Sequence, residues 1–228
     1  MKVYAFICTR DKNLSKTTEK LLSYLSSCNV DTKILVGSKS IFSGYQKAFE
    51  HVKPEDNDII ILCHDDIEIL SSRDTFAKAL SHRLADSKTG FVGVAGTTLL
   101  SKDATWWNHQ LWSQGKHRGF VFHGDNLESS QSTYYGQNDK VIVLDGLFLA
   151  AKAKVIRDIG LEKPEYLKGD WDFYDIHYTF TANQKGYNNY TVPIFILHNS
   201  FGNLAGRESW HDNRERFINK HSLPKEIK

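Results

Sequence analysis

Two adjacent carboxylates, Asp65 and Asp66, follow an unbroken apolar run at residues 59–62. Such a run, without polar alternation, is typical of a strand buried on both faces of a parallel sheet. Ligands of open α/β sheets bind beyond the carboxyl ends of the strands. A divalent cation there would neutralise both acids and an anionic ligand together. A solvated turn with an Asp helix cap before Ser71 and Ser72 explains the same residues equally well.

The second half of the chain carries the other candidate groups. Asp145 precedes a glycine, and His198 directly follows the last apolar run. An acid-rich segment contains Asp170, Asp172 and Asp175 at the expected start of a helix. Acids at a helix N-terminus are also favoured by the helix dipole alone, which is the interpretation we prefer for Asp170 and leave open for Asp172.

Apolar periodicity predicts the elements that position these groups. Beside the run before Asp65, strands are expected at residues 3–8, 31–36, 90–96, 140–144 and 190–197, and helices at residues 13–29, 43–52, 72–85, 153–159, 171–185 and 207–221. Pro193 lies inside the last strand, which we therefore expect at a sheet edge. The alternation of strands and helices predicts an α/β fold with a mixed, mostly parallel central sheet flanked by helices, in a single domain.

Residues 97–138 interrupt this pattern with three tryptophans and three histidines. A segment of this length within a compact domain is usually functional or an inserted hairpin, and residues 119–123 fit one short strand. The histidines at positions 109, 117 and 123 match no common zinc spacing and have no cysteine partner, so we favour the loop over a zinc site.

Composition excludes several classes of protein. The 228 residues include 29 basic and 27 acidic side chains, a net charge of +2 that gives no general attraction to nucleic acid. No apolar stretch approaches the roughly 18 residues needed to cross a bilayer, so we expect no transmembrane segment. The start of the chain lacks a signal-peptide layout, and three separated cysteines indicate thiols of a reducing compartment, hence a cytoplasmic protein.

Five short motifs occur in order, within a resemblance that covers about residues 2–202: His64-Asp65-Asp66-Ile67, Val92-Gly93-Val94-Ala95-Gly96, Trp106-Trp107, Asp145-Gly146 and His198-Asn199-Ser200-Phe201-Gly202. Together they resemble the inverting glycosyltransferases of GT-A fold. The most similar are a short glycosyltransferase-like group with His-x-Asp in place of Asp-x-Asp. The resemblance implies one Rossmann-like GT-A domain over residues 1–228. Its nucleotide-binding half would span about 1–100, its acceptor and catalytic half about 101–205, and a C-terminal helix 206–228.

The resemblance also implies a divalent metal, Mn²⁺ or Mg²⁺, and a nucleotide-diphospho-sugar donor. Asp66 and His198 match the family's metal ligands, whereas His64 replaces the usual first acid. The residues that match donor-binding positions are Thr9, Arg10, Asp11, Tyr45, Asp65, Asp145 and Gly146.

Asp175 matches the base that takes the proton of the acceptor hydroxyl, although Asp172 shares its helix face and is easily confused with it. His177 stands where the family usually has another acid. Trp106, Trp107, Trp171 and Asp172 are candidates for acceptor binding, with core packing expected for at least one tryptophan.

The implied activity is inverting transfer of a hexosyl or deoxyhexosyl group to a hydroxyl of a glycan, as in polysaccharide biosynthesis. Two alternatives remain. A non-catalytic nucleotide-sugar or carbohydrate-binding module with a decayed site would explain His64 and His177. A sugar nucleotidyltransferase would share the first half, but the glycine-rich loop that it needs after the first strand is missing. The chain is also compatible with being part of a larger multidomain glycosyltransferase.

Overall fold

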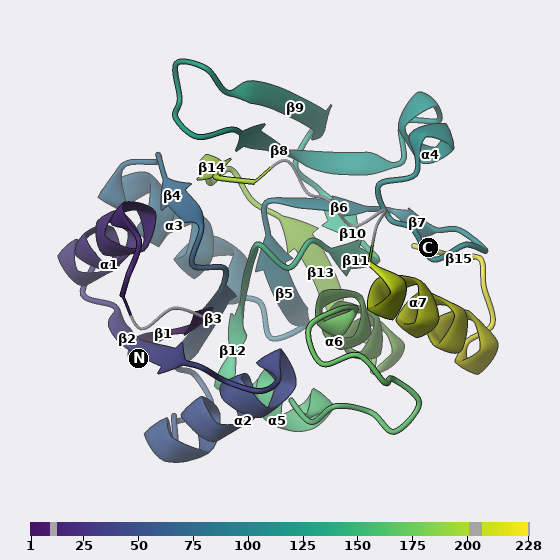
Figure 1. Cartoon of the computed structure of the whole chain (residues 1–228), viewed down its shortest axis with the longest axis horizontal. Coiled ribbons are helices and arrows are strands. Elements are labelled where there is room, and N and C mark those ends of the chain that lie inside the picture. Colours follow the sequence, from purple (N-terminus) through teal and green to yellow (C-terminus); the bar gives the residue numbers. More distant parts are fainter. Residues whose placement is uncertain (10–12, 201–206, 228) are drawn as a thin grey trace.

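A seven-stranded mixed sheet forms the centre of the molecule (Figure 1). The computed structural model describes residues 1–9, 13–200 and 207–227. From one edge to the other, the strands are β10 (Lys140–Val141), β13 (Asn188–Thr191), β5 (Thr89–Gly93), β12 (Phe148–Lys152), β3 (Ile59–Cys63), β1 (Val3–Thr9) and β2 (Asp31–Val36).

Strand direction brings two motifs to the same edge of this sheet. β1 is parallel to β2 and β3, as the βαβ pattern predicts. β12 lies antiparallel to β3, with Phe148 opposite Cys63 and Lys152 opposite Ile59. Because an antiparallel neighbour begins where β3 ends, the turn at Gly146 lies next to the segment that follows Cys63. The amide of His64 accordingly donates a hydrogen bond to the carbonyl of Leu147, at 3.1 Å.

A second sheet packs beside the first (Figure 1). Its strands are β11 (Val143–Leu144), β6 (Ala95–Thr97), β8 (His117–His123), β14 (Ile196–His198) and β4 (Ile67–Ile69), with β9 (Gln131–Gly136) paired to β8. Residues 64–66 connect β3 of the first sheet to β4 of the second, so the His64 motif lies at the junction of the two sheets. A separate pair joins β7 (Leu99–Leu100) to β15 (Lys225–Glu226).

Helices cover the sheets, with α1 beside β1 and β2 and α7 on the opposite side of the molecule (Figure 1). The helices are α1 (Lys16–Ser27), α2 (Ile41–Val52), α3 (Arg73–Leu84), α4 (His109–Ser113), α5 (Ala153–Ile159), α6 (Tyr174–Gln184) and α7 (Glu208–Lys220). Side-chain caps explain two of their starts, because Ser15 and Ser72 each accept a hydrogen bond from the amide three residues later. The apolar run of β3 is fully buried, as predicted.

The predicted α/β class, with a mixed sheet flanked by helices in one domain, is confirmed. Parallel pairs do not predominate in the central sheet, because β12 and β10 are antiparallel to their neighbours. The hairpin alternative for residues 97–138 is also confirmed, since β8 and β9 pair antiparallel. The edge position expected for residues 190–197 is wrong. Pro193 lies in a turn between β13, an interior strand, and β14 of the second sheet, so its missing N–H disrupts no strand ladder.

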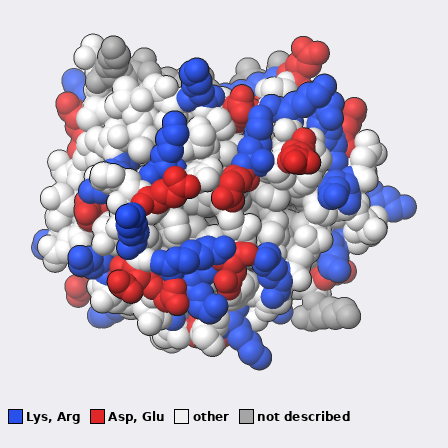
Figure 2. Space-filling view, turned by 90° about the horizontal axis from the view of Figure 1, so that it is seen from below, with Lys and Arg blue, Asp and Glu red and all other residues white. Residues whose placement is uncertain are grey.

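We find no helix among the described residues that could cross a membrane. None of the helices combines the length and the hydropathy that crossing a bilayer requires, within the ranges given above. On the face seen in Figure 2, lysine and arginine side chains are interspersed with aspartate and glutamate. That face therefore carries no broad field of one sign.

Candidate functional site

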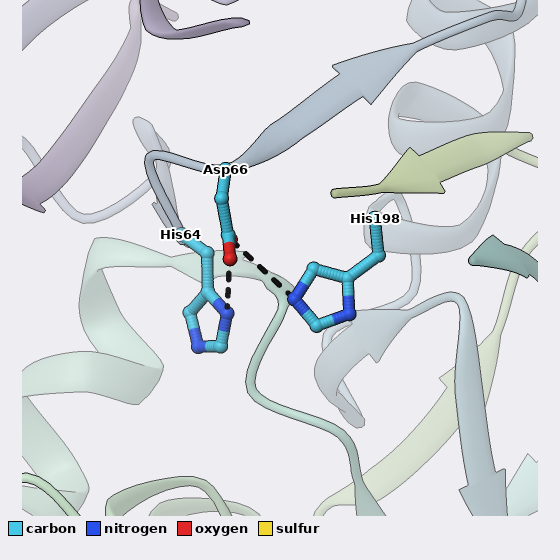
Figure 3. A group of neighbouring side chains, drawn as sticks. All are labelled: His64, Asp66 and His198. Carbon is cyan, nitrogen blue, oxygen red and sulfur yellow. Dashed lines mark ion pairs between the residues drawn. The ribbon is translucent and has the colours of Figure 1, made fainter. Parts of the chain in front are cut away.

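Three side chains converge at the junction of the two sheets (Figure 3). Oδ1 of Asp66 lies 3.6 Å from Nδ1 of His64 and 3.4 Å from Nε2 of His198. Of the residues that the structure describes, only these three form a group of metal-binding type, with their ligand atoms within 4.8 Å of one another. Antiparallel pairing of β14 with β4 brings His198 to this position, and the amide of Asn199 donates to the carbonyl of Asp66 at 2.8 Å.

The hydroxyl of Tyr174 determines which nitrogen of His64 is available as a ligand. It donates its single proton to the carbonyl of Gly146 at 2.9 Å, and it lies 2.9 Å from Nε2 of His64. Nε2 must therefore be the donor to the phenol oxygen, and burial lowers the pKa of His64, which favours the neutral ring. The lone pair on Nδ1 then faces Asp66. A Cβ at position 146 would collide with the Tyr174 hydroxyl, so this arrangement requires glycine there.

The electrostatics of this cluster suit a cation. Oδ1 of Asp66 is buried without a hydrogen-bond partner. Although burial opposes the effect, His198 and His64 hold the pKa of Asp66 below its usual value, and Asp66 raises the pKa of His198. A buried carboxylate oxygen that faces a nitrogen lone pair is repelled unless a positive charge lies between them. Two imidazoles and one carboxylate are a donor set typical of divalent first-row metals with open positions, so the residues fit a metal ion.

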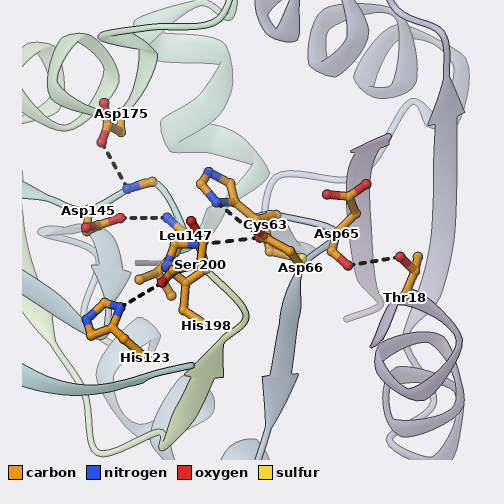
Figure 4. Close-up of polar contacts among 12 residues, drawn as sticks. Thr18, Cys63, Asp65, Asp66, His123, Asp145, Leu147, Asp175, His198 and Ser200 are labelled. Atoms are coloured by element: carbon orange, nitrogen blue, oxygen red, sulfur yellow. Dashed lines mark hydrogen bonds and ion pairs between the residues drawn. The ribbon is translucent and has the colours of Figure 1, made fainter. Parts of the chain in front are cut away.

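Asp175 lies in the first turn of α6 and faces the turn before β12 (Figure 4). Its carboxylate accepts hydrogen bonds from the amide of Gly146 at 3.0 Å and from the amide of Ile176 at 2.8 Å. Burial, and then the charge of Asp145, raise the pKa of Asp175 to about 7. A carboxylate with this pKa can accept a proton and release it again near neutral pH.

A single cavity of about 1030 Å³ contains both the histidine–aspartate cluster and Asp175. Of the residues predicted from the sequence, those that line it are Tyr45, Asp65, Asp66, Trp106, Trp107, Asp145, Gly146, Trp171, Asp172, Asp175 and His198. The carbonyl of Asp65 accepts a hydrogen bond from Thr18 at 3.0 Å, which anchors the motif to α1 (Figure 4).

The other residues predicted to bind the donor are buried or lie outside the described residues. Thr9 is buried at the end of β1 and is not part of the cavity lining. Tyr45 is fully buried, with its hydroxyl 3.5 Å from the carbonyl of Cys63, so it reaches the cavity only as part of the wall. Arg10 and Asp11 lie outside the described residues, as does Gly202 of the last motif.

The predicted acceptor residues separate into wall and packing roles. Trp106 is only 2% exposed and packs against Trp107 and His117, which is the core role expected for one tryptophan. Trp107 and Trp171 are half-buried in the cavity wall. Asp172 is buried, accepts a hydrogen bond from Ser209 at 2.6 Å and pairs with Arg207 at 3.4 Å, so it anchors the start of α7.

Two histidine interpretations are resolved by the geometry. His109, His117 and His123 form no metal group among the described residues, and Nε2 of His117 instead lies 2.6 Å from the carbonyl of Trp106. His177, which stands where the family usually has an acid, lies outside the cavity lining. Its Nδ1 lies 2.9 Å from the hydroxyl of Tyr166.

Sequence reasoning missed several side chains of the cavity. His64 was considered only as the lost first acid, and the His-x-Asp spacing was the signal that could have identified it as a ligand. His123 is a neighbour of His198, with ring centroids 5.7 Å apart, and its Nδ1 lies 3.3 Å from the carbonyl of Ser200. Other missed lining residues include Tyr174, Arg207, Trp210 and Arg214, and no local pattern marks them.

Two solved structures are similar to this chain. A solved structure described as GalNAc-T7 with UDP, GalNAc and Mn²⁺ matches with a TM-score of 0.57 at 10% identity, covering 96% of this chain and 48% of that one. The chain thus spans about half the length of that protein, and the likeness supports the GT-A fold. The structure of A197 from STIV matches with a TM-score of 0.48 at 12% identity, covering 84% of this chain and 81% of that one. Comparison with curated proteins finds no match.

The family comparison covers almost the whole chain. The profile of the glycosyltransferase-like family matches residues 5–221, which include both sheets, the cavity and α7. The resemblance seen in the five sequence motifs is confirmed by this match, and the chain belongs to the glycosyltransferase-like family.

Proposed function

We propose that this glycosyltransferase is a metal-assisted, inverting enzyme that moves a hexosyl or deoxyhexosyl group from a nucleotide-diphospho-sugar to a hydroxyl of a glycan. One observation carries the proposal: a metal-type cluster and a carboxylate with a pKa of about 7 share one cavity. The printed description of GalNAc-T7, with UDP, GalNAc and Mn²⁺, supports a nucleotide-sugar and a divalent metal for a protein of the same fold.

Different residues would hold the metal and accept the proton. His64, Asp66 and His198 would hold Mn²⁺ or Mg²⁺, and the two nitrogen ligands favour Mn²⁺, because Mg²⁺ prefers oxygen. When bound, the metal would neutralise charge on the leaving nucleoside diphosphate. Asp175 takes the proton of the acceptor hydroxyl, while the amides of Gly146 and Ile176 hold its carboxylate in place. The acceptor oxygen forms its bond to the anomeric carbon as the bond to the diphosphate breaks, which inverts that carbon.

Substrate binding follows from the two halves of the chain. We assign the donor to the side of β1 and β3, with contacts from Asp65, Asp145 and Gly146 of the cavity lining and from Arg10 and Asp11 of the segment after β1. Thr9 and Tyr45, both buried, would support this side of the cavity from behind. The acceptor then occupies the side of Trp107, Trp171 and α7. Polysaccharide biosynthesis in the cytoplasm is the setting that this proposal implies, in keeping with free thiols at Cys8, Cys28 and Cys63.

A binding module with a decayed site is the competing function. It was motivated by the loss of the first acid, but His64 lies within reach of the same metal position as Asp66 and His198. Calorimetric titration with a panel of nucleoside diphosphates, with and without Mn²⁺, followed by an assay of donor hydrolysis, separates the two functions. Metal-dependent binding with turnover supports the enzyme, and binding without any turnover supports the module.

A further inference from the structure

Helix α7 adds an aromatic and a basic side chain to the cavity that the proposed mechanism does not use. Trp210 and Arg214 both line the cavity, one helical turn apart. The ring of Trp210 lies 5.3 Å from that of Trp107 and 5.4 Å from that of Phe173, measured between centroids. The guanidinium of Arg214 lies over the Trp210 ring, 5.6 Å from its centroid. A flat apolar face and a cation are therefore adjacent in one wall.

Arg214 differs from the other arginines of α7 and its cap in forming no ion pair with a described residue. Among the described residues, Arg207 pairs with Asp172 and Arg216 pairs with Asp212, whereas Arg214 has no ion pair within 4.0 Å. Nε of Arg214 is buried without a hydrogen-bond acceptor. A buried charged donor without an acceptor is costly, so this nitrogen requires an oxygen from outside the described protein.

Asp103, the acid whose pKa is lowered by the charge of Arg214, does not supply that oxygen. Burial opposes the ionisation of Asp103, but hydrogen bonds from Ser101, Thr105 and Asn108 lower its pKa. The charge of Arg214 makes a smaller contribution in the same direction. The carboxylate of Asp103 is engaged by the hydroxyl of Ser101, the amide of Thr105 at 3.2 Å and the side chain of Asn108 at 2.8 Å. Asp103 is therefore engaged by its own neighbours, whereas Arg214 lines the cavity.

The position of α7 assigns this pair to the acceptor. Trp210 packs on Phe173, which immediately precedes Tyr174 at the start of α6, the helix that carries Asp175. The strands of the proposed nucleotide side, β1 and β2, lie on the opposite side of the molecule from α7 (Figure 1). A group bound at Trp210 and Arg214 is thus on the side of the proposed base.

We propose that the acceptor is an anionic glycan, whose sugar ring packs on Trp210 and Trp107 and whose carboxylate or phosphate oxygens bind the guanidinium of Arg214. This inference rests on the proposed glycosyl transfer. Guanidinium binds both kinds of oxyanion in a bidentate manner, and tryptophan offers a flat apolar surface to a sugar ring. Specificity arises because a neutral glycan offers the guanidinium of Arg214 only hydroxyl oxygens, which bind it more weakly than a carboxylate or phosphate does.

The test compares tetrasaccharides of equal length that contain glucuronic acid, glucose 6-phosphate units or only glucose. Binding is measured by calorimetry for the wild-type protein, Arg214→Gln, Arg214→Lys and Arg216→Gln. The last variant is the matched control, because Arg216 lies on the same helix, pairs with Asp212 and does not line the cavity. Affinity for UDP with Mn²⁺ is measured on the same four proteins, and thermal unfolding verifies that each is folded.

We expect the wild-type protein to bind one or both charged tetrasaccharides at least about tenfold more tightly than the neutral one. Arg214→Gln should remove this preference without changing the affinity for the neutral glycan or for UDP, Arg214→Lys should keep part of it, and Arg216→Gln should keep all of it. The preferred charged probe identifies whether the oxyanion is a carboxylate or a phosphate.

Three results would overturn the inference. The first is a wild-type protein that binds charged and neutral tetrasaccharides equally well. The second is a loss of the charge preference in Arg216→Gln as large as that in Arg214→Gln. The third is a loss of UDP affinity in Arg214→Gln, which would assign Arg214 to the donor diphosphate. Failure of the wild-type protein to bind any nucleoside diphosphate of the panel would instead overturn the proposed function. The glycan titrations are made without nucleotide, so the two failures are distinguishable.

Discussion

The hydroxyl of Tyr174 holds the imidazole of His64 in one tautomer. Nε2 of His64 donates to the phenol oxygen, which donates in turn to the carbonyl of Gly146, with both distances 2.9 Å. This leaves the lone pair of Nδ1 directed at Oδ1 of Asp66. Such a partner behind a metal-ligating histidine sets its orientation and basicity, so Tyr174 belongs to the proposed metal site without touching the ion.

Replacing Tyr174 by phenylalanine should weaken metal binding by roughly ten- to a hundredfold, the usual cost of losing such a partner. The affinity for Mn²⁺ in the presence of UDP, measured by calorimetry, tests this. Tyr178→Phe is the matched control, because Tyr178 lies one turn later on α6 and its hydroxyl donates to the carbonyl of Leu161, outside the cavity lining. Equal Mn²⁺ affinities in the two variants would remove Tyr174 from the site.

Asp66→Ala should lower the metal-dependent affinity for a nucleoside diphosphate by more than about tenfold, because it removes the only carboxylate of the ligand set. The titration is repeated without Mn²⁺, where the variant and the wild-type protein should agree. Asp170→Asn serves as the control, since that acid is paired with Lys163 away from the cluster. A retained Mn²⁺ dependence in Asp66→Ala would show that the metal binds elsewhere.

Asp175→Asn should keep donor binding and lower the rate of sugar transfer by about two to four orders of magnitude, the usual contribution of a general base. The amide keeps the size of the side chain but cannot take the acceptor proton. Donor affinity and turnover are measured on the same preparation. Unchanged turnover would exclude Asp175 as the base and leave Asp172 as the candidate.

The pH profile provides an independent measure of the same group. Only the ionised form of Asp175 accepts a proton, and its pKa is raised to about 7, so kcat/KM should rise with pH and level off above about 7. The charge of Asp145 contributes to that elevation. Asp145→Asn should therefore shift the midpoint to lower pH, whatever it does to the maximal rate. A midpoint that stays in place would mean that another group governs the profile.

His177 predicts a loss of stability in mild acid. Burial, and then His221, lower its pKa to about 4, below the usual 6.5. Above pH 6.5 the ring is neutral in the folded and unfolded chains alike, so the full stability is present. As the pH falls from 6.5 toward 4, the unfolded chain binds the extra proton first, and stability declines. Thermal melts at pH 7.5 and pH 5 should show a smaller difference in His177→Gln than in the wild-type protein, and an identical difference would refute this origin.

Local sequence was sufficient to predict the parts of the fold that depend on nearest neighbours. The apolar run of β3 and the helix expected at residues 72–85 follow from hydrophobic patterning. The hairpin in residues 97–138 was one of two alternatives for a long segment, and the cap of α3 by Ser72 was not predicted. The place of Pro193 did not follow, because the choice between an edge strand and a turn depends on which sheet receives β14.

The amino-acid sequence by itself determined the family, and it indicated Asp66, Asp175 and His198 as residues of the proposed site, since these depend on residue type and order. Only the tertiary structure decided that His64 joins Asp66 and His198, because the tautomer of its ring is set by Tyr174, 110 residues away. It also decided that Arg214 lines the cavity without an ion pair to any described residue, because the packing of Trp210 of α7 on Phe173 and Trp107 places the helix there. Contacts between distant segments depend on how the elements pack, and local periodicity carries no information about them.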